Sequence, residues 1–155
     1  MIERLRLELD NGKLTEYEYH RALDKFLDGG NGEKILARHE IAEIVSENLL
    51  RYAGESYMLH AWVVMPNHVH LLLTAVQGSS IAAIMQRLKS YTAHAINKRL
   101  DRSGHVWGKE YFDRYIRSST HFQNAAKYIE MNPVKAHLCR EPEHWPFSSA
   151  SRSLT

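Results

Sequence analysis

The sequence predicts an α+β domain in which helices cover one face of an antiparallel sheet. The chain of 155 residues is 44% hydrophobic and 25% charged, which is typical of a soluble globular domain with a core of its own. The spacing of its apolar residues changes along the chain between the period of a helix and the period of a strand. The resulting order is helix, strand, strand, helix, strand, helix, which favours an antiparallel sheet with helices packed on one face.

The first half of the chain is predicted to form two helices and a hairpin. A capping box at residues 15–18 begins the first helix, and apolar residues at helical spacing predict the second over 40–53. Aromatic and β-branched residues then predict a strand over 56–65. A turn at 66–67 joins it to a second strand over 68–76, so this segment reads as a tight β-hairpin.

The second half is predicted to form a helix, a short strand and a last helix. One apolar stripe at helical spacing runs over residues 80–100, and residues 111–117 alternate as a strand does. A second capping box places the start of the last helix at Thr120. This helix is expected to run to about Asn132, and because Pro133 disfavours helix at the preceding residue, Asn132 is expected in its last turn.

The charge is unevenly distributed along the chain. Residues 1–60 carry 8 Lys and Arg against 12 Asp and Glu, whereas residues 61–155 carry 12 against 6 and hold seven of the ten histidines. A positive field around the second part suits a polyanionic partner such as nucleic acid, although a basic surface of this size is often only solvated.

The cellular location is expected to be the cytoplasm. Cys139 is the only cysteine of the chain and cannot form an internal disulfide, which fits a reducing compartment. No apolar stretch approaches the roughly 20 residues that span a bilayer, and the charged N-terminus is unlike a signal peptide.

Two histidines one residue apart are the first candidate site. His68 and His70 lie on a predicted strand, where side chains alternate between faces, so both imidazoles are expected on one face and Val69 on the other. Two neutral imidazoles on one face can hold a divalent ion and leave its other positions open. The alternative is a hydrogen-bonded pair on an exposed face of the sheet.

A tyrosine and an amide on the last predicted helix are the second candidate. Tyr128 and Asn132 are four residues apart, so they are neighbours on the helix surface beside its apolar stripe. They could complete a site that the histidines begin. The alternative is an ordinary boundary tyrosine and a residue at a helix end before proline.

Four segments of the chain resemble the single-tyrosine HUH transposases, and most closely the REP-associated tyrosine transposases, which are related to the transposases of the smallest bacterial insertion sequences. These segments are AWVVMPNHVH at 61–70, YFDR at 111–114, YIEMNPVK at 128–135 and WPFSS at 145–149. The resemblance covers about residues 40–150 and has its four segments in the order of the family. It implies a ferredoxin-like sheet and an enzyme that cleaves and rejoins single-stranded DNA bearing hairpins.

The resemblance also implies the roles of particular residues. The His-hydrophobic-His motif of the family falls on His68 and His70, its nucleophile on Tyr128 and its third metal ligand on Asn132. The expected ion is Mg²⁺ or Mn²⁺, because imidazole tolerates Mn²⁺ and oxygen ligands suit either ion. The expected intermediate is a 5′-phosphotyrosine, which conserves the energy of the phosphodiester for rejoining.

Basic and aromatic residues of the second part are candidates for DNA contacts, with solvated or packing roles as the alternative for each. They are Arg87, Lys89, Lys98, Arg99, Trp107, Arg114, Arg117 and Lys135. His60 and His121 are candidates for supporting groups near the site, with structural roles as their alternative.

We expect residues 1–155 to form a single transposase-like domain, with a helical extension over 1–36 and the catalytic core over 37–150. One departure from the family is visible, because its usual first strand beside the histidine strand has no counterpart before Ser56. Another segment or a partner chain could fill that position, and relatives that are monomers or dimers leave a homodimer open.

Two other classes of function are considered. The first is a domesticated or inactive module of the same fold that binds single-stranded nucleic acid without reacting. The second is a small metal-dependent hydrolase, but the chain is shorter than the roughly 250 residues of the barrels that use such a histidine pair.

Overall fold

The computed structural model describes residues 34–108, 116 and 118–152 of the chain. Two compact units are distinguished, Met1–Ile35 and Leu36–Thr155, and the elements named below from α3 onward belong to the second. The elements in chain order are η2 (Ile35–Ala37), α3 (His39–Tyr52), β1 (Tyr57–Val64), β2 (Val69–Ala75), α4 (Ile81–Leu100), α5 (Ser119–Lys135) and η3 (Pro142–His144). The helix predicted from residue 15 lies outside the described residues, and so does the strand predicted over 111–117 except for Ile116.

β1 and β2 form the predicted antiparallel hairpin. Val64 pairs with Val69 beside the turn and Tyr57 pairs with Ala75 at the far end, with a bulge between Leu59 and Ala61. The backbone N–H of Met65 donates to the carbonyl of His68 at 2.8 Å and closes the turn. The hairpin prediction is therefore confirmed.

An extended segment near the C-terminus binds the outer edge of β1. The N–H of Val64 donates to the carbonyl of Phe147 at 2.8 Å, and the N–H of Ser149 donates to the carbonyl of Trp62 at 2.9 Å. Ser148 forms an isolated antiparallel bridge with Val63 between these two bonds. Within the described residues β2 pairs with β1 alone, so this segment does not occupy the position beside the histidine strand.

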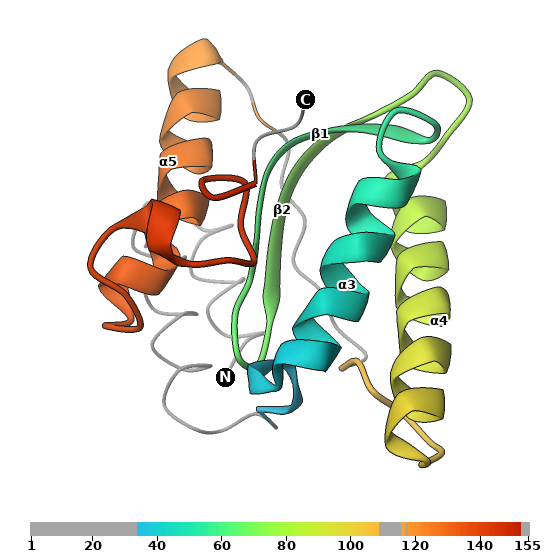
Figure 1. Ribbon diagram of the computed structural model, residues 1–155. Helices are drawn as coiled ribbons and strands as arrows, with labels where there is room; N and C mark the ends of the chain where they lie inside the picture. The colour runs from blue at the N-terminus through green and yellow to red at the C-terminus, as the bar shows by residue number, and fades with distance from the viewer. Residues whose placement is uncertain (1–33, 109–115, 117, 153–155) are drawn as a thin grey trace, which may run out of the picture. The chain divides into compact units, whose positions relative to one another are not determined.

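The α+β class is confirmed, but the helices do not all lie on one face of the sheet. Figure 1 shows α5 on one side of the hairpin and α3 with α4 on the other. The reason lies in β1 and the residue after it, because Ala61, Trp62, Val63, Val64 and Met65 are all buried. Neighbouring side chains on a strand point to opposite faces, so this run requires cover on both faces.

Each face has its own packing. The core below α5 joins Ala61, Val63 and Leu72 of the hairpin to Ile129 of the helix. On the side of α3, the Tyr57 hydroxyl donates to the carbonyl of Leu49 at 2.6 Å. The apolar core therefore fixes α5 over one face of the hairpin. The Tyr57 hydrogen bond helps to fix α3 over the other face.

The predicted N-terminus of α5 is wrong, and its C-terminus lies three residues beyond Asn132, which is in the last turn as predicted. Ser118, not Thr120, is the N-cap, and its hydroxyl accepts from the N–H of His121 at 3.0 Å. Serine is as good a cap as threonine. Ser118 has His121 three residues after it, so the helix begins without the Glu or Gln that a capping box has at that position. The helix also continues through Pro133 to Lys135, because proline in the last turn removes only one of the hydrogen bonds there.

α4 agrees with the prediction. Ser80 caps its N-terminus by accepting from the N–H of Ala83 at 3.1 Å, and Asp101 ends it in a left-handed conformation at φ 50°. Across the described residues, no helix has the length and apolar character needed to cross a membrane.

Candidate active site

His68 lies at the end of the hairpin turn, directly before β2, and only 9% of its surface is exposed. Its Nδ1 is 2.7 Å from the side-chain oxygen of Asn67. Because that oxygen can only accept, Nδ1 carries the proton and the lone pair is on Nε2. Asn67 therefore selects the tautomer and holds the ring, as a second residue commonly does behind a metal-binding histidine.

His70 meets His68 on the same face, as predicted. Their Nε2 atoms are 3.1 Å apart and their ring planes are nearly perpendicular, at 87°. Two nitrogens bound at right angles to one ion at about 2.1 Å would be about 3.0 Å apart. The spacing of the two nitrogens thus fits adjacent positions around one divalent ion.

Burial favours the neutral form of this pair. The pKa of His68 is lowered to about 2, first by burial of the ring and then by the neighbouring His70. A neutral imidazole is the form that binds a metal ion, so His68 is available as a ligand at neutral pH.

Tyr128 of α5 lies against the histidine pair. Its ring centroid is 5.9 Å from that of His70, and the two rings meet edge to face at 80°. The ring also packs against the core that Ile129 and the hairpin share. Lys135, which α5 includes only because it continues past Pro133, has its ammonium nitrogen 4.8 Å from the Tyr128 ring centroid.

Asn132 follows Tyr128 by one helical turn and is 2% exposed. Its amide is therefore held inside the protein on the helix that carries the tyrosine. In the described part of the chain, no three His, Cys, Asp or Glu side chains are grouped to hold a metal. An amide oxygen suits a hard ion such as Mg²⁺ or Mn²⁺, and Asn132 as that ligand stays a prediction.

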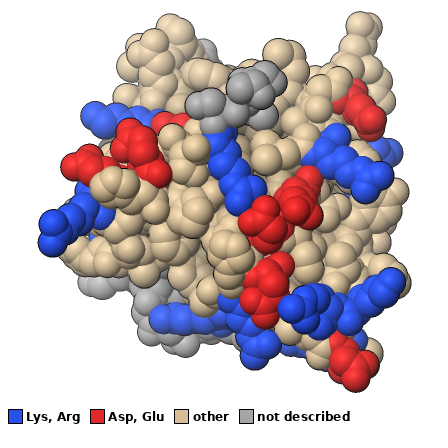
Figure 2. All heavy atoms as spheres, viewed as in Figure 1, with Lys and Arg blue, Asp and Glu red and all other residues tan. Residues whose placement is uncertain are grey.

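The candidate DNA contacts fall into three groups. Lys98 and Arg99 are exposed in the last turn of α4, where Figure 2 shows basic side chains gathered toward the end of the helix. Arg87 is exposed on the same helix and donates to the Ser56 hydroxyl at 3.1 Å. Arg114 and Arg117 lie outside the described residues.

The other two candidates on this side make internal contacts. Lys89 donates to the carbonyl of Gly108 at 3.3 Å, and burial lowers the pKa of its ammonium group. The indole N–H of Trp107 donates to the Thr92 hydroxyl of α4 at 2.8 Å, which indicates a packing role. His60 likewise has a structural partner in the Thr74 hydroxyl at 2.8 Å.

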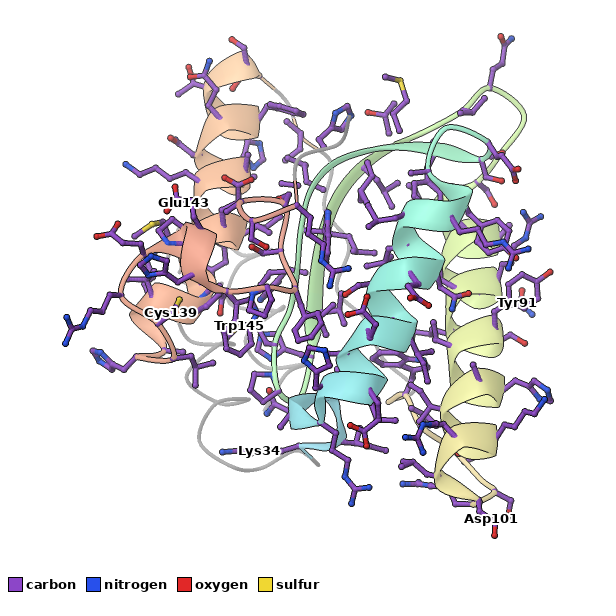
Figure 3. The ribbon with its side chains drawn as sticks, in the orientation of Figure 1. Lys34, Tyr91, Asp101, Cys139, Glu143 and Trp145 are labelled. Atoms are coloured by element: carbon purple, nitrogen blue, oxygen red, sulfur yellow. The ribbon has the colours of Figure 1, made fainter. Side chains whose placement is uncertain are left out.

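The sequence reasoning missed a group of residues that joins α5 to β1. The Ser149 hydroxyl donates to a Glu130 carboxylate oxygen of α5 at 2.7 Å and accepts from the N–H of Trp62 at 3.1 Å. The Trp145 indole donates to the carbonyl of Val64 at 3.0 Å, and Figure 3 shows this side chain between α5 and the hairpin. Trp145 and Ser149 both lie in the WPFSS segment that carries the family resemblance, but that segment did not indicate which residues of β1 and α5 it contacts.

Replacing Ser149 with Ala is expected to lower the free energy of unfolding by about 1–3 kcal/mol, because it leaves the Trp62 N–H and the partly buried Glu130 carboxylate without this hydrogen-bond partner. Urea denaturation followed by tryptophan fluorescence measures this. Ser151→Ala is the matched control, since its hydroxyl makes only a long bond of 3.4 Å to the Ser148 carbonyl. Equal effects of the two changes would show that Ser149 does not link α5 to β1.

Comparisons with known proteins identify the family of this chain. The family model described as IS200-like transposase matches residues 33–132, well over half of the chain. A REP-associated tyrosine transposase of Escherichia coli (strain K12) is 26% identical over 99 residues, which are 63% of this chain and 57% of that protein. The chain thus spans little more than half the length of this relative.

A solved structure shows the same fold. It is described as the structure of a REP-associated tyrosine transposase bound to a REP hairpin, and it superposes with a TM-score of 0.63 at 22% identity, over 79% of this chain and 71% of the other. The match to the family model, together with these two similarities, establishes that the chain belongs to the IS200-like transposases.

Proposed function

We propose that this chain is a metal-dependent endonuclease and strand transferase that cleaves and rejoins single-stranded DNA bearing a hairpin. The observation that carries the proposal is the meeting of three predicted residues: the His68 and His70 nitrogens 3.1 Å apart, and the Tyr128 ring 5.9 Å from the ring of His70. The histidines belong to the hairpin and Tyr128 belongs to α5. His70 and Tyr128 are 58 positions apart in the sequence, and they meet within one chain.

The metal ligands would be His68, His70 and Asn132. When bound, Mg²⁺ or Mn²⁺ supplies Lewis-acid stabilisation of negative charge on the oxygens of the scissile phosphate. The protein's contribution is to fix the two imidazoles, through the Asn67 hydrogen bond and the burial of His68, before any ligand arrives.

Tyr128 would be the nucleophile. Its hydroxyl oxygen forms a bond to phosphorus while the bond from phosphorus to the 3′ oxygen breaks, which gives a 5′-phosphotyrosine and a free 3′-OH after protonation. A 3′-OH of another strand end can then reverse the exchange without ATP, because the number of phosphate ester bonds is unchanged. The packing of Tyr128 in the core on α5 restricts the ring and favours a fixed direction of attack.

The hairpin substrate is proposed from the related transposase that was solved bound to a REP hairpin and from the basic balance of residues 61–155. The test is incubation of the purified chain with Mn²⁺ and a labelled library of single-stranded hairpins, followed by denaturing electrophoresis. A labelled adduct that survives denaturation supports the proposal, and sequencing the captured strand identifies the site. Retarded DNA on a native gel without any adduct would favour the non-reacting binding module instead.

Lys135 is expected to assist this reaction. Its ammonium group lies over the Tyr128 ring, where it attracts the ring and places positive charge beside the attacked phosphate. Lys135→Ala should slow adduct formation by about 10-fold, while Lys135→Arg should retain most of the rate. Rates of adduct formation under single turnover measure this, and Lys127→Ala, which removes an exposed lysine of the same helix, is the control. Equal rates for the Lys135→Ala protein and the wild type would contradict the assignment.

A further inference from the structure

A second group of aromatic and basic side chains lies at the end of the hairpin far from the histidines. We call it the distal cluster, and its members are Arg51, Tyr52, Ser56, Arg87 and Tyr91. It adjoins the end of the hairpin where Tyr57 pairs with Ala75. Ala75 follows His70 by five residues, which is about 17 Å at the usual rise of a strand.

The aromatic part of the distal cluster is a partly exposed pair of tyrosine rings. The Tyr52 and Tyr91 rings have centroids 5.7 Å apart at an interplanar angle of 39°, and the Arg51 guanidinium lies 5.6 Å from the Tyr52 ring centroid. Tyr91 is 47% exposed, and Figure 3 shows it on the outer side of α4. An exposed tyrosine that packs against another and is flanked by a guanidinium is a surface on which an unpaired base can stack.

The basic part of the distal cluster lies next to hydroxyl groups. Arg87 is on the same face of α4 as Tyr91, four residues before it, and donates to Ser56. A cavity of about 270 Å³ beside Arg87 is lined by the hydroxyl-bearing Ser56, Ser79 and Ser80. Guanidinium and serine hydroxyl groups are common partners of phosphate oxygens in nucleic-acid complexes.

The two arginines of the cluster, Arg51 on α3 and Arg87 on α4, are both exposed. Among the residues that the structure describes, neither Arg51 nor Arg87 forms an ion pair. Glu55 is an exposed acidic residue in the turn between α3 and β1. Its replacement by Gln removes a negative charge beside the cluster, whereas replacement of either arginine removes a positive charge.

We propose that the distal cluster binds the loop of the hairpin substrate, with an unpaired loop base stacked on Tyr91 and neighbouring phosphates held by Arg51 and Arg87. This inference rests on the proposed function for the nature of the substrate. Bases within a duplex stem are already stacked and paired, so an exposed tyrosine recognises unpaired bases. In a hairpin these bases are in the loop and in the flanking strands, and the flanking strand that is cleaved must lie at Tyr128. The loop is the unpaired part that a stem carries away from the active site.

The experiment measures binding of a fluorescently labelled hairpin by anisotropy, for an intact loop and for a loop of abasic sites. Tyr91→Ala should weaken binding of the intact hairpin by about 10-fold and leave binding of the abasic hairpin unchanged. Tyr91→Phe should bind the intact hairpin like the wild type, because it keeps the ring. Arg51→Gln with Arg87→Gln should lower the slope of log K against log salt by about 1–2. Glu55→Gln, the matched control, should not weaken binding.

Two outcomes would overturn the inference. One is equal affinity of the Tyr91→Ala and wild-type proteins for the intact hairpin. The other is an equal loss for intact and abasic loops, which would show that Tyr91 acts on the structure of the protein or on another part of the DNA.

Adduct formation by the wild-type protein, measured beside the anisotropy, separates this inference from the proposed function. If the wild type forms no adduct with any DNA but shows the loop-dependent effect of Tyr91→Ala, the proposed function fails and the inference stands. If adducts form and the loop-dependent effect is absent, the inference fails and the proposed function stands.

Discussion

Tyr128→Phe is expected to abolish covalent capture of DNA while the protein still folds and binds its hairpin. The change removes only the hydroxyl oxygen, so the ring keeps its contacts with His70 and with the core around Ile129. Loss of a nucleophile commonly costs about 10³-fold or more in rate, which places adduct formation below detection. Denaturing electrophoresis with Mn²⁺ and a labelled hairpin measures the adduct, and anisotropy measures binding.

The control for this prediction is Tyr91→Phe, which makes the same chemical change on α4. It should form the adduct at the rate of the wild type, because Tyr91 is on the outer side of that helix. Adduct formation by Tyr128→Phe at an appreciable rate would assign the nucleophile to another residue. Loss of both the adduct and the binding would show instead that the hydroxyl stabilises the fold.

The histidine pair could be predicted from the sequence because it depends on local geometry. The alternation of a strand puts His68 and His70 on one face, and the Pro66-Asn67 turn fixes where the hairpin reverses. Nothing beyond a few residues has to be known. The same local reasoning could have identified Asn67 as the residue that orients His68, since a short amide side chain next to an imidazole can reach its Nδ1.

The course of α5 was harder to predict, because two local signals compete at each end. Ser118 and Thr120 are both good caps, and the capping-box pattern favoured the wrong one. At the other end Pro133 argued for termination, yet the N–H of Ala136 still donates to the Asn132 carbonyl at 3.0 Å and extends the helix. This last turn is what brings Lys135 over the Tyr128 ring.

The contacts that join α5 to β1 could not be derived from local patterns. Ser149 and Trp62 are 87 positions apart, and the pairing depends on where the C-terminal segment lies against the hairpin.

The covering of both sheet faces could, by contrast, have been predicted from the unbroken apolar run before the turn, because a strand with one exposed face would alternate. The ferredoxin-like arrangement, which needs the segments outside the described residues, stays a prediction.

His70→Ala is expected to remove binding of Mn²⁺ at this site and, with it, the metal-dependent cleavage. Of the two imidazole nitrogens 3.1 Å apart, only that of His68 would remain, and a single imidazole with one amide makes a weak site. We expect at least a 100-fold loss of affinity for Mn²⁺, of the order seen when even supporting groups are removed. Titration calorimetry measures metal binding directly and does not depend on DNA or on turnover.

Asn67→Ala makes this prediction sharper, because it removes the partner that selects the His68 tautomer and leaves both imidazoles in place. It should lower Mn²⁺ affinity by about 10–100-fold, between the wild type and His70→Ala. His60→Ala is the matched control, since His60 has Thr74 as its partner on the hairpin and should leave the affinity unchanged. Wild-type affinity in His70→Ala, or cleavage that continues in EDTA, would reject the metal site. A graded loss across the three variants would instead tie metal binding to the fixed geometry of the two rings, because the Asn67 change alters only how His68 is held.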